Sequence, residues 1–222
     1  MAEPFSAARG VSKDPRSWTG DALAWVPRRL WVEGSALLAF CVAILATNYA
    51  LTALPNVKLF DLMVFVCGYT LGFRRAAIVA VASWTVYGAF NPWGATTASL
   101  LTTVAFSETA YALAGAAFHR LFPPRRLRTL PGLHSLALCA LALASTLLYD
   151  VAANLYTGIS WAQFAGSSDY ARWIMIALFN PGALWFSAMH VGSNVVFFST
   201  LAPVLIKGVE KARGLLPGQR GS

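Results

Sequence analysis

The chain has 222 residues, of which 57% are hydrophobic and 12% charged, and its formal net charge is +8. Soluble domains carry about 25% charged residues, so this composition argues against an ordinary soluble domain and predicts an integral membrane protein. The basic excess alone is compatible with nucleic-acid binding or with cytoplasmic loops, and the positions of the charges decide between the two.

The polar N-terminal segment, residues 1–33, lacks the basic, apolar and small-residue regions of a signal peptide. We interpret it as a cytoplasmic tail that ends in an interfacial segment. A membrane domain is expected over residues 34–206, and a basic cytoplasmic tail over 207–222. Breaks in the apolar pattern of this domain predict six helices, at about 35–54, 59–73, 76–90, 96–121, 133–156 and 173–206.

Turn-forming residues separate these helices. Pro55 follows the first, Asn91-Pro92-Trp93-Gly94 follows the third, and Asn180-Pro181-Gly182 could break the last. The second and third helices have about 15 residues each, or roughly 22 Å, which is shorter than the ~30 Å hydrocarbon layer. Two full crossings and one re-entrant hairpin therefore both remain open for this pair.

The basic residues follow the predicted topology closely. With the N-terminus inside, the cytoplasmic segments 1–34, 74–75, 119–132 and 207–222 hold 15 of the 17 Lys and Arg residues. Only Lys58 and Arg172 fall outside, which is the asymmetry expected of a multi-pass membrane protein. The fold class predicted is an all-α bundle of six transmembrane helices with both termini in the cytoplasm, and the net charge gives no reason to expect nucleic-acid binding.

The three predicted outer segments concentrate amide, charged and indole side chains. They read "LPNVKLFD", "FNPWGATT" and "YTGISWAQFAGSSDYARW". The aromatic residues alone would also fit an interfacial belt. Together with the amides and charges they predict a small-molecule site, because such sites combine apolar walls with a few polar groups.

Few ionisable residues lie inside the predicted helices: Glu108, Asp150 and His190. Asp150 and Asn154 are four residues apart, as are His190 and Asn194, so each pair shares one helix face. These faces could line the same cavity, or they could hydrogen-bond to one another between helices. For Glu108 a protonated carboxyl bonded to a neighbour is one interpretation.

Metal and enzyme motifs are missing. His119, His134 and His190 lie on different segments, and the sequence has no HExxH motif and no P-loop. The His190-x-x-x-Asn194 pair resembles that of rhomboid intramembrane serine proteases, but no GxSG nucleophile motif and no later helix with a histidine base accompany it. We therefore expect no enzymatic activity, no metal and no cofactor, with a rhomboid-like protease and a non-catalytic scaffold as alternatives.

Several patches in order resemble the substrate-binding S components of energy-coupling factor (ECF) vitamin transporters. They are "ALPNVKLFDLMVFVCGYTLGFRRAAIVA", "FNPWG", "LLYDVAANLYTGISW" and "SAMHVGSNVVFFSTLAPVL", together with a first helix in which Ala39 and Ala43 form a small-xxx-small motif. The resemblance covers roughly residues 35–210. The segment "FNPWG" around Trp93 is shorter than the corresponding segment of many S components.

The resemblance implies a multi-pass protein of the prokaryotic cytoplasmic membrane that captures a vitamin or related micronutrient at the outer face. It implies docking through Ala39 and Ala43 on a transmembrane T component that carries two ABC ATPase subunits, which hydrolyse the ATP. The substrate stays open: the aromatic residues suit a flat heterocycle, and Lys58 or Arg172 could meet an anionic group. The predicted substrate-binding residues are Asn56, Lys58, Asn91, Trp93, Asp150, Asn154, Trp161, His190 and Asn194.

Overall fold

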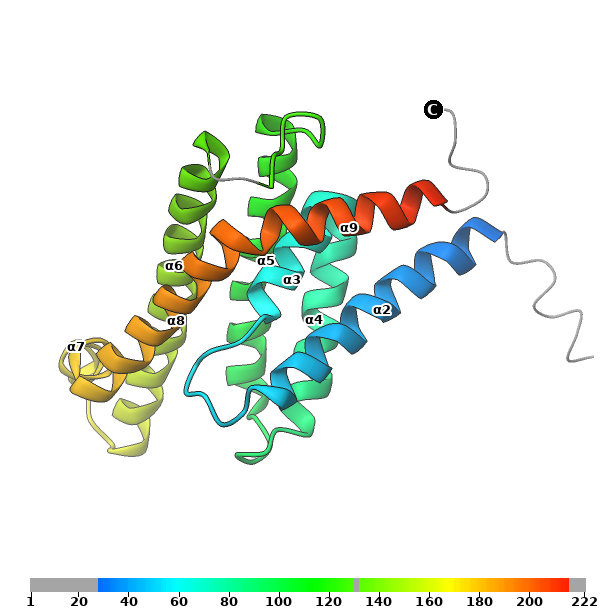
Figure 1. Ribbon diagram of the computed structural model, residues 1–222. Coiled ribbons are helices and arrows are strands. Elements are labelled where there is room, and N and C mark those ends of the chain that lie inside the picture. The colour runs from blue at the N-terminus through cyan, green and yellow to red at the C-terminus, as the bar shows by residue number, and fades with distance from the viewer. Residues whose placement is uncertain (1–27, 130–131, 216–222) are drawn as a thin grey trace, which may run out of the picture. The chain divides into compact units, whose positions relative to one another are not determined.

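The computed structural model describes residues 28–129 and 132–215, and over these residues all regular secondary structure is helical (Figure 1). The predicted all-α class is thereby confirmed for the described part of the chain. The eight helices are α2 (Arg28–Ala50), α3 (Phe60–Leu71), α4 (Phe73–Ala89), α5 (Ala98–Leu121), α6 (Leu133–Phe164), α7 (Tyr170–Phe179), α8 (Pro181–Thr200) and α9 (Ala202–Leu215).

The last predicted helix is three helices in the structure. Asn180 ends α7 and caps α8, since its side-chain oxygen accepts a hydrogen bond from the Ala183 amide at 2.9 Å. Pro181 occupies the first position of α8, where its missing N–H costs nothing. The two helices are bent by 52° at this break. A further break follows at Leu201, after which α9 continues across residue 207, where the sequence predicts a tail.

The fifth helix is longer than predicted. It continues past Tyr156 to Phe164, because no strong break occurs before Gly166, whose φ of 62° closes the helix. The amide of Ser167 returns to the carbonyl oxygen of Ala162 at 2.9 Å. Much of the predicted third outer loop is therefore helical, and Trp161 lies on α6.

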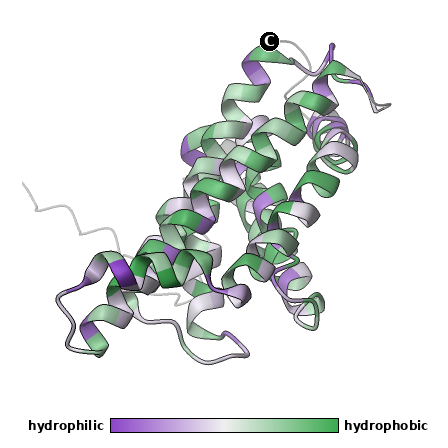
Figure 2. Ribbon diagram, turned by 90° about the vertical axis from the view of Figure 1, so that its left-hand side faces the viewer, coloured by the Kyte–Doolittle hydropathy of each residue, from purple (hydrophilic) through white to green (hydrophobic). Residues whose placement is uncertain are grey.

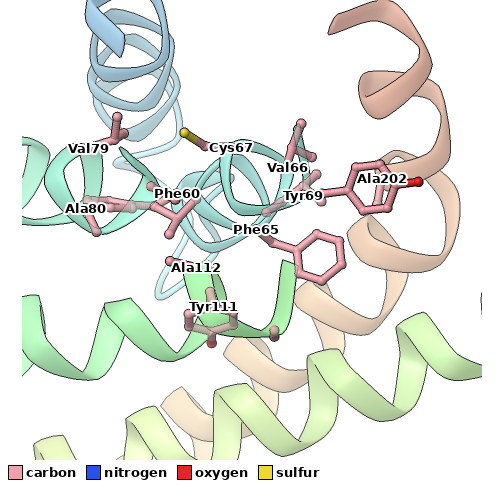
Figure 3. Packing of buried hydrophobic residues seen from close by; sticks show 14 of the residues in the cluster. Phe60, Phe65, Val66, Cys67, Tyr69, Val79, Ala80, Tyr111, Ala112 and Ala202 are labelled. Carbon is pink, nitrogen blue, oxygen red and sulfur yellow. The ribbon is translucent and has the colours of Figure 1, made fainter. Parts of the chain in front are cut away.

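The core is built around α3, which contacts α4, α5, α8 and α9. Ten of its 12 residues are buried. Phe60 and Phe65 of α3 lie close to Tyr111 and Ala112 of α5 (Figure 3). Being surrounded by other helices explains how so short a helix can be apolar on all sides.

Gly68 and Gly115 allow α3 and α5 to approach closely. A Cβ at Gly115 would overlap the carbonyl oxygen of Phe65, and a Cβ at Gly68 would overlap that of Ala112. These contacts are backbone to backbone, so side-chain rotation cannot relieve them. The two glycines thus set the distance between the helices.

Two described helices are long and apolar enough to cross a membrane, over Leu30–Ala50 and Leu133–Phe164. The bent pair of α7 and α8 makes a third if it counts as one span. Hydrophobic positions, coloured green, predominate over the helical ribbon as a whole (Figure 2). The described residues therefore contain two or three candidate membrane spans, fewer than the six crossings that the sequence predicts.

Contacts divide the chain inside α2, between Ala36 and Leu37. All residues of the candidate site belong to the unit that begins at Leu37. The predicted N-terminal tail lies mostly outside the described residues.

Candidate functional site

The described residues enclose a cavity of about 830 Å³. The segment after α2, the end of α4, the start of α5, and helices α6, α7 and α8 contribute to its wall. Its aromatic lining residues are Trp84, Tyr87, Trp93, Tyr149, Trp161 and Phe186. Its size is in the range of small-molecule sites, about 300–1,000 Å³.

The three predicted outer segments meet at this cavity. Seven of the nine predicted substrate-binding residues line it, namely Asn56, Lys58, Asn91, Trp93, Asp150, Asn154 and Trp161. Residues distant in sequence are therefore brought together as the prediction required, although their contact with a substrate stays a prediction.

Some of these residues also have structural contacts. Asn56 has a φ of 55° and donates its side-chain N–H to the Phe186 carbonyl oxygen at 3.0 Å, which ties the segment after α2 to α8. Asn91 accepts the backbone N–H of Trp93 at 2.9 Å, and Trp93 itself is 78% exposed. These contacts shape the cavity wall.

His190 and Asn194 do not line the cavity. Both are fully buried in α8, where they take part in a polar network. The His190 ring bonds through Nδ1 to Asp150 Oδ1 at 2.7 Å and through Nε2 to Asp61 Oδ2 at 2.6 Å. Asn194 Nδ2 also donates to Asp61 Oδ2, at 2.7 Å. Of the two predicted arrangements, interhelical hydrogen bonding therefore describes His190 and Asn194, while Asp150 belongs to both the network and the cavity wall.

A second layer of the network joins α5, α6 and α8. The Tyr111 hydroxyl donates to Thr146 Oγ1 at 2.9 Å, and Asn194 Nδ2 lies 2.9 Å from the same oxygen and 3.3 Å from Tyr111 Oη. All three side chains are fully buried. The asparagine thus connects this layer to Asp61.

Replacing Thr146 by valine is expected to lower the free energy of unfolding by about 0.5–1.5 kcal/mol, because two buried polar groups lose a partner at nearly constant volume. Thr157→Val is the matched control, since Thr157 bonds only to the Ala153 carbonyl oxygen of its own helix. Thermal unfolding of the two variants in detergent measures the difference. Equal stability would show that the second layer contributes nothing.

Glu108 lies on α5 and is fully buried. The indole N–H of Trp84, on α4, donates to its Oε2 at 3.1 Å. The neighbour to which Glu108 is bonded, which the sequence did not identify, is therefore Trp84, and Trp84 also lines the cavity.

Lys58 supplies the cavity's positive charge. Its Nζ lies 4.8 Å from the ring centroid of Tyr149 and 5.3 Å from that of Trp84, which are cation–π distances. Among the cavity-lining residues it is the one Lys or Arg, and Asp150 is the one acid. Arg172 is exposed and does not belong to this lining.

Sequence reasoning missed the central residue of the network. Asp61 was assigned to an outer segment, whereas the structure places it fully buried in the first turn of α3. The signal was available, because a single acid within the apolar string "LFDLMVF" needs a buried partner. Trp84 and Tyr149 were missed for lack of any local signal.

No group of three or more His, Cys, Asp or Glu residues in the described part of the chain has a geometry that could hold a metal ion. The His190 ring, with a carboxylate oxygen at each nitrogen, has no free nitrogen for a ligand bond. The two carboxyl groups bonded to it, those of Asp61 and Asp150, belong to the same network.

Comparison with known proteins returns no match among protein-family models, curated proteins or solved structures.

Proposed function

We propose that this chain is the substrate-binding S component of an ECF-type importer, with six membrane crossings and both termini in the cytoplasm. The single observation that carries the proposal is the cavity of about 830 Å³. All three predicted outer segments contribute residues to its wall. An aromatic wall with a few amide and charged groups suits the capture of a small heterocyclic compound such as a vitamin.

The packing of the helices supports six crossings. α3 has 12 residues, but it contacts four other helices and needs little lipid contact of its own. The polar groups of α5 and α8 face one another in a network, so these helices can lie at membrane depth. Such burial is the arrangement expected for short or polar segments in a membrane bundle.

The first helix supports docking on a T component. Phe40 and Ile44 of α2 are buried in the core, whereas Leu38 and Val42 are 64% and 56% exposed. Ala39 is exposed beside them, and Ala43 is half-buried. Small residues on an exposed apolar face permit close helix contact in lipid, which suits a partner membrane protein.

The rhomboid-like alternative is less well supported by the geometry. Both ring nitrogens of His190 are bonded to carboxylates, and Asn194 donates to Asp61. The hydroxyl of Ser193 donates to the backbone carbonyl oxygen of His190 at 3.1 Å. A protease needs its His and Asn free to act on a substrate carbonyl and a serine activated by a base.

The proposal is tested by purifying the full-length protein from membranes, extracting the small molecules that copurify with it, and identifying them by mass spectrometry. We expect one compound of vitamin size in near-stoichiometric amount. Ala153→Trp, which fills the cavity, should reduce its amount at least ten-fold.

Val151→Trp is the matched control for this experiment, because Val151 lies on the same helix, is 49% exposed and does not line the cavity. It should retain the compound. Absence of any retained compound from the unmodified protein, or equal retention by both variants, would contradict the proposed function and leave the scaffold alternative.

A further inference from the structure

Three ionisable side chains from three helices form one continuous chain of hydrogen bonds beneath the cavity. Asp61 of α3 is bonded to His190 of α8, and His190 to Asp150 of α6. A fourth ionisable side chain, Glu108, is fully buried on α5, which packs against α3. Asp150 lines the cavity, so the chain of bonds ends at the cavity wall. We name these four residues the carboxyl–imidazole chain.

Hydrogen bonding and burial fix how many protons these four residues hold. An ionised carboxylate oxygen can only accept, so each of the two bonds at His190 needs a proton between the ring nitrogen and the carboxylate oxygen. Glu108 is fully buried, accepts one bond from the neutral Trp84 indole, and has no partner for Oε1 among the described residues. An ionised carboxylate there would lose its hydration without a counter-charge, so Glu108 keeps its proton. The four residues therefore hold three protons.

The net charge of the chain follows from this count. A neutral imidazole brings one of the three protons with it. The other two protons contribute +2 and the three carboxylates contribute −3, so the carboxyl–imidazole chain carries a net charge of −1. The remaining partners are neutral donors: Trp84 to Glu108, and Asn194 to Asp61. The phenol groups of Tyr111 and Tyr149, whose ring centroids lie 6.4 Å apart, add no charge while protonated.

Lys58 is the counter-ion of this chain. It is the one Lys or Arg of the cavity lining, and its ammonium group lies over the Tyr149 ring, which packs edge-on against the His190 ring with a centroid distance of 5.5 Å. It makes no ion pair within 4.0 Å with a carboxylate of the described residues, and its ammonium group rests instead on the Tyr149 and Trp84 rings. The charges of +1 and −1 cancel across the cavity floor.

We propose that this neutral floor makes the cavity selective for compounds without net charge, either uncharged or zwitterionic, that stack a flat ring on its aromatic wall. The inference rests on the proposed function, since it assumes that the cavity binds a small molecule. An unbalanced charge brought into such a site would lose its hydration without a free counter-charge. Lys58 alone would suggest an anionic ligand, but its charge is already balanced by the chain beneath it.

The proton count is tested without any ligand. In the full-length double variant His119→Gln, His134→Gln, His190 is the one histidine left of three. Nitrogen NMR of ¹⁵N-histidine-labelled protein at pH 7 should show both ring nitrogens protonated. Infrared spectra should show one protonated-carboxyl band, which Glu108→Gln removes. A ring with a single protonated nitrogen, or no such carboxyl band, would overturn the charge count.

The ligand class is tested by the net charge of the compound that copurifies from membranes. A compound with zero net charge at pH 7 supports the inference, and a net anion or cation overturns it. Lys58→Met leaves the floor at −1 and should reduce retention at least ten-fold, whereas Lys58→Arg keeps the charge and should retain the compound. Equal retention by these two variants would also count against the inference.

The proposed function and the inference about ligand class can fail separately. If no compound copurifies, both fail, and the NMR and infrared measurements still test the charge count. If a charged compound copurifies, the proposed function stands and the inference about selectivity falls.

Discussion

Asp61→Ala is expected to lower the free energy of unfolding by about 3–5 kcal/mol, the usual cost of removing one partner from a buried charged pair. Asp61 is fully buried and accepts hydrogen bonds from both His190 and Asn194. Its removal would leave the charged ring with one partner and the buried amide with only the hydroxyls of the second layer. Thermal unfolding in detergent, followed by tryptophan fluorescence, measures the loss.

Glu210→Ala is the control for this prediction. Glu210 also pairs with a basic residue, Arg213, at 3.2 Å, but both side chains are about one-third exposed. Partly exposed ion pairs of this kind contribute about 0–1 kcal/mol. If Asp61→Ala were no more destabilising than Glu210→Ala, the buried network would not be what holds α3 to α8.

Gly115→Ala is the second substitution with a large expected effect, a loss of about 3 kcal/mol or more, at the upper end of the range for overpacked cores. The added methyl group would overlap the Phe65 carbonyl oxygen and approach the Tyr69 amide nitrogen to 2.8 Å. Both contacts are with the backbone, so α3 and α5 would have to separate. The same argument applies to Gly68→Ala, which would meet the Ala112 carbonyl.

Gly192→Ala is the matched control, because a Cβ there has nothing within 4 Å. It is expected to be neutral or to stabilise the helix by up to about 1 kcal/mol, since alanine is the better helix former. The unfolding temperatures of the two variants should therefore move in opposite directions. A Gly115→Ala protein as stable as Gly192→Ala would show that α3 and α5 are less closely packed than described.

The polar network and the close packing serve the same part of the molecule. Asp61, Tyr111, Thr146 and His190 come from α3, α5, α6 and α8, and their hydrogen bonds fix these helices beneath the cavity. In a low-dielectric interior such hydrogen bonds are stronger than in water, so they hold the four helices together next to the cavity.

The predicted helices and their breaks correspond to much of the structure because they depend on local signals. Pro55, the Asn91-Pro92-Trp93-Gly94 turn and Asn180-Pro181 all mark places where the helical pattern stops or restarts. Helix ends without such signals were placed less well. The end of α6 was predicted at Tyr156 and lies at Phe164, since Gly158 is accommodated within the helix.

The sequence by itself determined the helical class and the candidate spans, because composition and turn residues are properties of short segments. It also predicted the seven residues that the tertiary structure brings to one cavity. Only the tertiary structure decided which polar groups meet. Asp61 and His190 are 129 residues apart, and no local pattern states that their side chains bond. The placement of His190 and Asn194 beneath the cavity follows from the packing of α8 against α3 and α6, and helix packing is set by contacts between distant segments.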